Sequence, residues 1–406
     1  MAQEPLNEQT AQAALEAFIE RIPPCPPFEG TGVVIPGGGR YFPSAWVCLN
    51  MLRRAGCTLP IQVWHLGPDE MTPTMRRLAE ERGASCVDAH AVRAEHPVRR
   101  LGGWELKAYA ILRTGFRHVL LLDADNVPLV DPTFLFRGRQ YAETGAIFWP
   151  DFTRFAPDHA IWRLTGVAWR DEPEFESGQI CVDKERCWRA MSLALWMNEH
   201  SDFWYRHIYG DKDTFHLAFR KLGSPYAMPA AAPVHLDRAT IAQADFAGDV
   251  IFHHRHGDKW RLDGANRAVR GFRDETACAR FAGELVAQQA TIEEELRVAL
   301  AARLVTRAWS YERADVPPRS MSFLADGRIG EGAAPSERAW KADEEGLVIL
   351  GRPSEVTCRL RRDDVSGGWS GHCVDLPRTP VRLVARAGSA AAVAAAAARP
   401  DAAARP

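Results

Sequence analysis

The 406-residue sequence predicts an α/β protein: a Rossmann-like, mostly parallel central sheet with helices on both faces, followed by a small C-terminal β module. In the N-terminal part, short apolar runs alternate with helical patterns, which indicates parallel strands joined by crossover helices. After Pro317 and Pro318 the pattern changes to short alternating or apolar runs with turn signals between them, which is typical of antiparallel strands. A chain of this length is comfortable for two domains.

The elements of the N-terminal part follow in order. Residues 8–22 have the apolar periodicity of an amphipathic helix, and a proline-rich stretch at 23–27 ends it. Strands are predicted at residues 32–36, 61–65 and 118–122, and helices at residues 43–54, 72–82 and 104–114. Gly56 and Gly83 lie just past the ends of two of these helices, where capping glycines are common.

The remainder of the chain has a different character. Residues from about 140 to 260 are irregular and rich in Trp, Phe, His and Asp, as loops that carry chemistry often are. Short strands are predicted around residues 321–323, 347–350, 356–360 and 381–384. We therefore expect an N-terminal helix and linker at 1–29, a catalytic domain at 30–275, a long helix at 276–307, an antiparallel β module at 308–386 and a disordered Ala-rich tail at 387–406.

Composition narrows the class of protein. Apolar residues make up 46% of the chain and charged residues 25%, so a large buried core is expected. The net charge of −2, with acidic and basic residues interspersed, argues against a dedicated nucleic-acid binder. Nine irregularly spaced cysteines without a C-x-x-C pair fit a reduced compartment better than disulfides or zinc. Because neither a signal peptide nor a spanning apolar run is recognisable, we expect a cytoplasmic protein without an integral membrane segment.

Two aspartates follow a buried strand directly. Residues 119–122 are apolar, and Asp123 and Asp125 come next. Because residues i and i+2 of an extended chain point the same way, both carboxylates project from the carboxyl end of the strand, where open α/β sheets bind ligands. Neighbouring carboxylates repel each other unless a cation neutralises them, and Mn²⁺ or Mg²⁺ prefers such oxygen ligands. The pattern predicts a metal site that anchors a diphosphate, with a solvated turn as the structural alternative.

Three further segments accompany this motif in a fixed order. They are Gly-Trp-Glu-Leu-Lys-Ala-Tyr at 103–109, Glu-Ser-Gly-Gln at 176–179 and Gly-Asp-Lys-Asp-Thr-Phe at 210–215. Over about residues 100–260 the set resembles the fungal-type α-mannosyltransferase family related to Mnn1 and Mnn2, and more distantly the glycogenin-like family. The resemblance implies a GT-A fold and metal-dependent transfer of a sugar from a GDP- or UDP-sugar to a glycan or other hydroxyl acceptor, with retention of configuration.

The resemblance also implies a third metal ligand late in the fold. Residues 251–260 are similar to a His-x-x-Gly…Lys-x-Trp segment of the glycogenin-like family, and His254 aligns through Gly257, three residues on. In a strand, His254 and His256 would share a face while His253 points away. His254 is therefore the first candidate ligand and His256 the second.

Donor contacts are predicted on three segments. In the resembling families a lysine at the position of Lys107 approaches the donor, which implies a phosphate or ribose contact. Lys259 and Arg255 are candidate cationic partners of the diphosphate, together with the metal-binding aspartates. Gly38 and Arg40 lie in a glycine-rich loop after the first strand, where the backbone can approach a nucleotide. The loop matches neither a P-loop nor a dinucleotide fingerprint.

The predicted catalytic residues are Asp211, Glu176 and Gln179. In a retaining transfer the leaving phosphate can take the acceptor proton while a carboxylate or amide stabilises the oxocarbenium-like centre, and the resemblance points to Asp211 or Glu176 for that place. Gly178 would let the sugar lie against the backbone, and residues 149–152 are a candidate aromatic wall for the acceptor.

Other classes compete with this interpretation. A haloacid-dehalogenase-type phosphatase also places Asp-x-Asp after an apolar strand, with Asp123 as nucleophile, but its later Gly-Asp-x-x-x-Asp motif is matched here only with the wrong spacing at 210–213. A sugar-nucleotide-forming nucleotidyltransferase would need a more convincing loop at 36–40. A degenerate transferase that only binds glycan or nucleotide is the third alternative.

Overall fold

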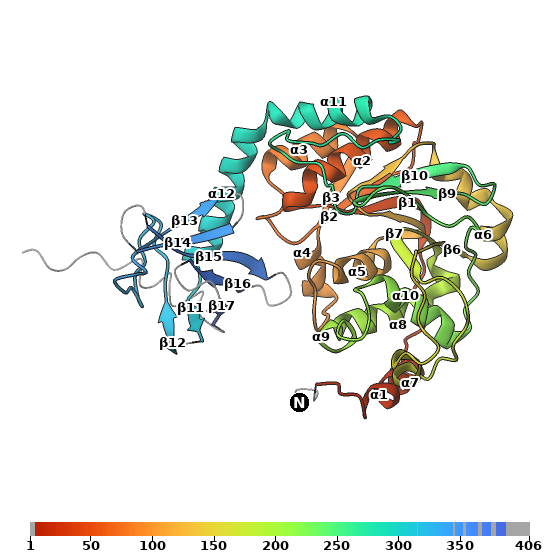
Figure 1. Ribbon diagram of the computed structural model, residues 1–406, viewed down its shortest axis with the longest axis horizontal. Helices are drawn as coiled ribbons and strands as arrows, with labels where there is room; N and C mark the ends of the chain where they lie inside the picture. Colours follow the sequence, from red (N-terminus) through yellow and green to blue (C-terminus); the bar gives the residue numbers. More distant parts are fainter. Residues whose placement is uncertain are drawn as a thin grey trace, which may run out of the picture. The chain divides into compact units, whose positions relative to one another are not determined.

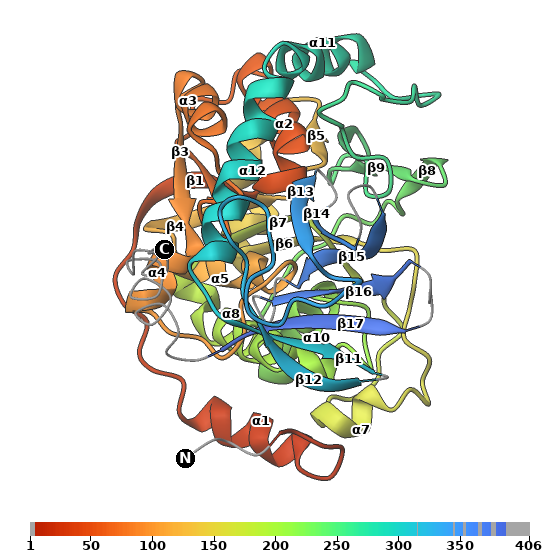
Figure 2. The ribbon, with the colours of Figure 1, turned by 90° about the vertical axis from the view of Figure 1, so that its left-hand side faces the viewer.

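The computed structural model describes residues 5–314, 316–343, 346–351, 355–363, 368–374 and 379–386, so the predicted tail at 387–406 lies outside the described residues. The chain divides into two compact units, residues 1–289 and 290–406 (Figures 1 and 2). Among the described residues, none of the helices combines the length and apolar character that a bilayer span requires.

A six-stranded sheet forms the centre of the first unit, in the order β3-β2-β1-β4-β7-β6. Four neighbouring strands are parallel: β3 (Ala84–Asp88), β2 (Ile61–His65), β1 (Glu29–Pro36) and β4 (Phe116–Leu122). The strand β7 (Phe175–Asp183) runs antiparallel to β4, and β6 (Ala146–Pro150) runs antiparallel to β7. Only β7 therefore opposes the common direction, which confirms the predicted mostly parallel sheet.

Helices cover both faces of this sheet (Figure 1). On one face lie α2 (Phe42–Arg54), α3 (Pro73–Glu81) and α11 (Glu275–Val286). On the other lie α4 (Ala89–Glu95), α5 (Glu105–Arg113), α8 (Lys184–Glu199), α9 (Ser201–Trp204) and α10 (Lys212–Leu222). The shorter elements of this unit are α1 (Ala11–Glu20), η1 (Gly39–Tyr41), η2 (Pro132–Arg137), α6 (Arg139–Thr144) and α7 (Ile161–Thr165). This arrangement confirms the predicted fold class.

A second, four-stranded antiparallel sheet adjoins the end of β4. Its order is β5 (Asn126–Pro128), β10 (Val250–His254), β9 (Thr240–Ala244) and β8 (Val234–Asp237). In the register of β5 and β10, His254 pairs with Asn126. Because β5 begins directly after the Asp-x-Asp motif, this register carries a residue from position 254 to the carboxyl edge of β4.

Two expectations about helices are wrong. The single helix expected at 276–307 is interrupted at residues 287–288, so that α11 is followed by a separate α12 (Gln289–Val305). The segment from 140 to 260, expected to be irregular, contains the sixteen-residue helix α8. Every residue from Ala190 to Asn198 in α8 is buried. A helix surrounded by protein has no polar stripe, so its sequence lacks the periodicity by which a surface helix is recognised.

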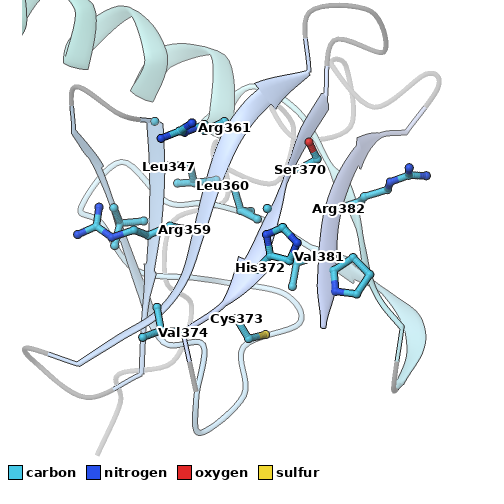
Figure 3. Close-up of a pocket in the computed structure, with 14 residues that line it drawn as sticks. Leu347, Arg359, Leu360, Arg361, Ser370, His372, Cys373, Val374, Val381 and Arg382 are labelled. Carbon is cyan, nitrogen blue, oxygen red and sulfur yellow. The ribbon is translucent and has the colours of Figure 1, made fainter. Parts of the chain in front are cut away.

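The second unit is a seven-stranded antiparallel sheet that confirms the predicted β module. Its strands are β11 (Trp309–Arg313), β12 (Val316–Met321), β13 (Ala339–Asp343), β14 (Gly346–Leu350), β15 (Val356–Asp363), β16 (Gly368–Cys373) and β17 (Pro380–Ala385). One face packs a core around Trp309, Tyr311 and Leu383. The other borders a hollow of about 610 Å³, in which His372 lies between Arg359 and Arg382 (Figure 3).

Candidate active site

The three predicted metal ligands converge. One ligand atom each from Asp123, Asp125 and His254 lie within 4.8 Å of one another. His254 Nε2 is 3.1 Å from Asp125 Oδ1 and 3.8 Å from Asp123 Oδ2. The two aspartates follow β4, and His254 ends β10, whose pairing with β5 places the imidazole against them. The tertiary structure thus joins positions that are about 130 residues apart in the sequence.

This donor set fits a divalent cation. Around an octahedral ion with ligands at about 2.1 Å, neighbouring ligand atoms are about 3 Å apart and opposite ones about 4.2 Å apart, close to the spacing found here. Two carboxylates and one imidazole are ligands that Mn²⁺ accepts well. The other imidazole nitrogen, His254 Nδ1, lies 3.4 Å from Glu176 Oε1. A carboxylate in that place is the usual partner of a metal-bound histidine, because it fixes the ring orientation.

The cluster has unusual electrostatics. Burial raises the pKa of Asp123 to about 6, with Lys107 opposing the shift and Asp125 adding to it. Burial also acts to raise the pKa of Asp125, but His254 and Lys259 outweigh it and hold that pKa below its usual range. Burial disfavours the imidazolium of His254, yet the neighbouring Asp125 and Glu176 dominate and raise its pKa well above the ordinary value. A protonated His254 therefore neutralises the aspartates together with Lys107 and Lys259.

Lys107 lies beneath the aspartates. Its Nζ donates to Asp123 Oδ2 at 2.9 Å and to Ser177 Oγ at 3.1 Å, and it is 3.3 Å from Asp211 Oδ2. Ser177 Oγ donates in turn to Asp211 Oδ2 at 3.0 Å. Lys107 is buried, and its ammonium group is neutralised by ion pairs with Asp123 and Asp211. The structure brings Lys107 and Asp211 to the site as predicted, and it adds Ser177, which the sequence analysis did not assign.

A second basic group lies on the other side of the carboxylate pair. Lys259 Nζ forms an ion pair with Asp125 and is 5.8 Å from the centre of the Tyr41 ring. Arg40 Nη2 donates to Tyr41 Oη at 2.8 Å. Arg40 is exposed and the Lys259 side chain is 36% exposed, so both cations are accessible to an anionic ligand.

The glycine loop after β1 lies beside the Asp-x-Asp motif. A Cβ added at Gly37 would be 3.6 Å from Ala124 Cβ. At Gly38 an added Cβ would be 2.7 Å from His65 Cβ, so this glycine is required by packing against β2 rather than by an approaching nucleotide. The loop lies beside the Asp-x-Asp motif as expected, but Gly38 is needed for close packing against His65.

Residues 176–179 line the cluster. Gln179, predicted to be catalytic, and Gly178, predicted to lie against the sugar, have structural roles there. Gln179 is fully buried; its Oε1 accepts from Asn126 Nδ2 at 2.6 Å and its Nε2 donates to Gln243 Oε1 at 2.8 Å. Its amide therefore ties β7 to the second sheet. A Cβ at Gly178 would be 2.5 Å from His254 Nδ1, so Gly178 makes room for the metal ligand.

Several candidates lie elsewhere. Arg255 is 1% exposed, donates through Nε to Asp258 O at 2.7 Å and stacks over Trp260 at 4.1 Å, so the structure does not bring it to the cluster. The reason is strand alternation, since His254 occupies the site-facing position. His253 points away as predicted, toward Phe272.

Four other residues that the sequence analysis considered, His256, Trp149, Phe152 and Asp213, have the following surroundings. His256 is exposed, and its ring centre is 5.9 Å from that of His254. Within the predicted wall at 149–152, Trp149 is buried and donates through Nε1 to Ala244 O, so it offers no surface to an acceptor. Phe152 is 43% exposed and stacks on His235 with ring centres 3.8 Å apart. Asp213 is buried beside Lys212 and accepts from Tyr209 N at 3.0 Å, which makes it a structural anchor of the loop before α10.

Known proteins resemble this chain over the same region. A family model described as "Mannosyltransferase putative" matches residues 30–163 and 170–254. The α-1,2-mannosyltransferase MNN2 of Saccharomyces cerevisiae is 25% identical over 248 residues, which is 50% of this chain and 42% of the yeast protein. The α-1,2-mannosyltransferase MNN23 of Candida albicans is 33% identical over 236 residues, 45% of this chain and 39% of that protein. The chain spans less than half the length of these curated relatives.

Solved structures also resemble this chain. The galactosyltransferase LgtC in complex with donor and acceptor sugar analogues aligns with 66% of this chain and all of its own, at 15% identity and a TM-score of 0.41. The family match, unlike this one, rests on sequence. It takes in more than half of the 406 residues and includes all three metal-ligand candidates. The chain belongs to this mannosyltransferase family, and its resemblance to the fungal α-mannosyltransferases is confirmed.

Proposed function

We propose that the protein transfers a mannosyl group from a nucleoside-diphosphate sugar to a hydroxyl group of a glycan, with a divalent cation bound by Asp123, Asp125 and His254. The observation that carries this proposal is the convergence of those three side chains at the carboxyl edge of β4. The names of the relatives, α-1,2-mannosyltransferases, support mannose as the sugar. GDP-mannose is therefore the first donor to test, with UDP-sugars as the alternative.

In this proposal one set of basic residues binds the diphosphate, and Lys107 positions the carboxylates. Arg40 and Lys259 offer accessible positive charge for the diphosphate. The cation would neutralise charge on the diphosphate as it leaves. Lys107 fixes the orientation of Asp123 and Asp211, so the carboxylates are in place before any substrate binds.

Asp211 and Glu176 are the carboxylates near the reacting sugar in this proposal, consistent with a retaining transfer. Asp211 is held by Lys107 and Ser177, while Glu176 accepts from the Gly178 N–H at 2.8 Å and faces His254. Burial acts to raise the pKa of Glu176, but His254 and Lys107 outweigh it and lower that pKa to about 2. Both groups are thus fixed, and Glu176 is ionised at neutral pH, which suits stabilisation of an oxocarbenium-like centre.

Replacement of Asp125 by alanine tests the proposal. The Asp125→Ala variant loses a ligand and leaves His254 with one partner fewer, so Mn²⁺-dependent binding of GDP or UDP is expected to weaken at least about a hundredfold. Calorimetric titration with each nucleotide, with and without Mn²⁺, measures this directly. Transfer from GDP-mannose, followed by NMR of the anomeric proton of the product, reports the configuration.

The matched control is Asp158→Ala, which removes an exposed carboxylate outside the cluster. It should bind nucleotide as the wild type does. If Asp125→Ala bound the nucleotide with unchanged affinity, the site assignment would be wrong. Robust hydrolysis of an aryl phosphate that depends on Asp123 would instead favour the phosphatase alternative.

A further inference from the structure

An aromatic cluster accompanies the proposed active site, and it consists of the exposed Trp104 and Tyr209 and the partly buried Tyr205. The ring centres of Trp104 and Tyr205 are 5.9 Å apart, and those of Trp104 and Tyr209 are 6.2 Å apart. Trp104 is 51% exposed and Tyr209 is 76% exposed. Exposed aromatic surface gathered in one place is unfavourable in water, and it commonly marks a binding site.

The aromatic cluster is tied to the metal ligands by short, rigid paths. Trp104 precedes α5 and is three residues before Lys107, about 4.5 Å along a helix axis. Lys107 Nζ contacts both Asp123 and Asp211. Tyr209 is two residues before Asp211, which precedes α10. Both helices therefore begin at the sheet edge where β4 ends, and they present their aromatic residues there.

The loop that carries Tyr209 is fixed in this position. Gly210 has a φ of +77°, and a Cβ added there would be 2.9 Å from the Trp104 ring, so the backbone packs directly on the indole. The N–H of Tyr209 donates to Asp213 Oδ2 at 3.0 Å, and Tyr205 Oη donates to Asn198 Oδ1 at 2.5 Å. The aromatic surface is therefore preorganised and needs no ordering when a ligand binds.

The side of the site on which the aromatic cluster lies points to the acceptor. The accessible cations suited to a diphosphate, Arg40 and Lys259, lie on the Asp125 side of the carboxylate pair. Trp104 and Tyr209 belong to the segments that carry Lys107 and Asp211, which contact each other and pair with Asp123 through Lys107. A diphosphate held by these cations would leave the aromatic surface free for another part of the substrates. Aromatic faces bind the apolar C–H face of a pyranose ring, while nearby polar groups bind its hydroxyls.

We propose that Trp104 and Tyr209 form a stacking platform for a pyranose ring of the acceptor glycan. This inference rests on the proposed function, because it takes the metal cluster as the donor site. It differs from the wall predicted at 149–152, of which Trp149 is buried.

Glycan binding by Trp104→Ala tests the platform. The probe is an array of linear and branched manno-, gluco- and galacto-oligosaccharides, applied to the protein saturated with Mn²⁺ and GDP. The wild type is expected to bind at least one oligosaccharide, and Trp104→Ala and Tyr209→Ala to bind it at least about tenfold more weakly. Trp104→Phe, which keeps a flat apolar ring, should restore most of the affinity. Thermal unfolding checks that the variants are folded.

Two controls separate the possible failures. Trp169→Ala removes a tryptophan that is 43% exposed, comparable with Trp104, and should bind glycans normally. Calorimetry with Mn²⁺ and GDP or UDP tests the donor site independently. Normal nucleotide binding together with glycan binding that is absent from the wild type, or unchanged in Trp104→Ala, would overturn the platform alone. Absence of nucleotide binding from the wild type would overturn the proposed function instead.

Discussion

Four carboxylates and three cationic side chains meet at the end of β4. They are Asp123, Asp125, Glu176 and Asp211, with Lys107, His254 and Lys259. His254 is cationic only while it is protonated, and an imidazole must be neutral to bind a metal. The same residue can therefore neutralise the empty cluster as an imidazolium or hold an ion as a ligand. This exchange makes metal binding and proton release one process.

Mn²⁺ affinity is accordingly expected to rise with pH between about 5.5 and 8. The pKa of His254 is raised by Asp125 and Glu176 despite its burial, and that of Asp123 is about 6, so both groups hold protons that the ion must displace. Calorimetry in buffers of different ionisation enthalpy should detect release of about one proton per Mn²⁺ at pH 7. A pH-independent affinity with no proton released would contradict His254 as a ligand.

Gly178→Ala should damage the metal site while the fold remains. The added methyl group would lie 2.5 Å from His254 Nδ1 and 2.8 Å from Glu176 Oε2, which forces the imidazole to move. We expect Mn²⁺ affinity to fall at least about tenfold, with a loss of about 1–3 kcal/mol in unfolding free energy. Calorimetry and urea unfolding measure the two effects.

Gly115→Ala is the control for this substitution, because a Cβ at Gly115 would meet no atom within 4 Å. It should leave both the Mn²⁺ affinity and the stability close to those of the wild type. Equal Mn²⁺ affinities for the Gly178→Ala and Gly115→Ala variants would contradict the prediction, because they would show that the His254 ring accommodates the added methyl group.

At the scale of elements, α10 positions one side of the site, and Glu172 anchors it. Glu172 Oε1 is 3.0 Å from His216 Nε2, Glu172 Oε2 accepts from Tyr226 Oη at 2.8 Å, and Arg220 forms an ion pair with the same carboxylate. His216 and Arg220 belong to α10, which begins just after Asp211. Burial acts to raise the pKa of Glu172, but these partners outweigh it and lower that pKa to about 2.

Glu172→Gln is therefore expected to reduce the unfolding free energy by about 3 kcal/mol at pH 7. The pKa of the carboxyl is depressed in the folded state, so its stabilisation is present above the unfolded-state value of about 4.3 and is lost as the pH falls toward 2. The difference between wild type and variant should therefore narrow from pH 7 to pH 3.5 in urea titrations followed by tryptophan fluorescence.

A parallel measurement on Glu143→Gln sets the baseline. Glu143 pairs with Arg139 one helical turn away, and both side chains are largely exposed, so its loss should change stability by less than about 0.5 kcal/mol. If the difference in unfolding free energy between wild type and Glu172→Gln did not depend on pH, the substitution would act through packing rather than through the charge of Glu172.

Several elements of the first unit could be predicted from local patterns, and two of those that were not predicted share a cause. The strand at 61–65 and the helix at 43–54 follow from local patterns, and the structure has β2 and α2 there. The helix α8 and the strand β6 were not predicted, because both are buried almost throughout and so lack a polar face that marks the period. Whether an element is buried on all sides depends on the elements packed around it, so its own sequence shows no alternation of polar and apolar residues.

At the scale of the whole molecule, the two units have separate cores. The core around α5, α8 and the sheet contains residues up to Phe219, while the core of the β module contains residues from Leu300 to Leu383. The family match ends at residue 254, and all of the candidate ligands lie in the first unit. The β module, with its basic hollow, lies outside the residues that the family model matches.

A fragment comprising residues 1–289 is expected to fold and to bind Mn²⁺ and nucleotide with the affinity of the full chain, since the fragment keeps its core and its ligands intact. Circular dichroism and calorimetry on the fragment check this. A fragment that folds but binds nucleotide more than about tenfold more weakly would assign part of the donor site to the β module.

The sequence by itself determined that two carboxylates lie together at the end of a buried strand. Apolar residues 119–122 require a buried strand, and alternation then aims Asp123 and Asp125 together at the sheet edge. The family resemblance named His254, Lys107 and Asp211 for the same site, and the tertiary structure decided how these distant residues meet the aspartates. The register of β10 on β5 selects His254 and turns Arg255 into the core, and the starts of α5 and α10 bring Trp104 and Tyr209 together. Local patterns encode the direction of a side chain along its own strand, whereas its partners depend on strand pairing and helix packing, which no short segment specifies.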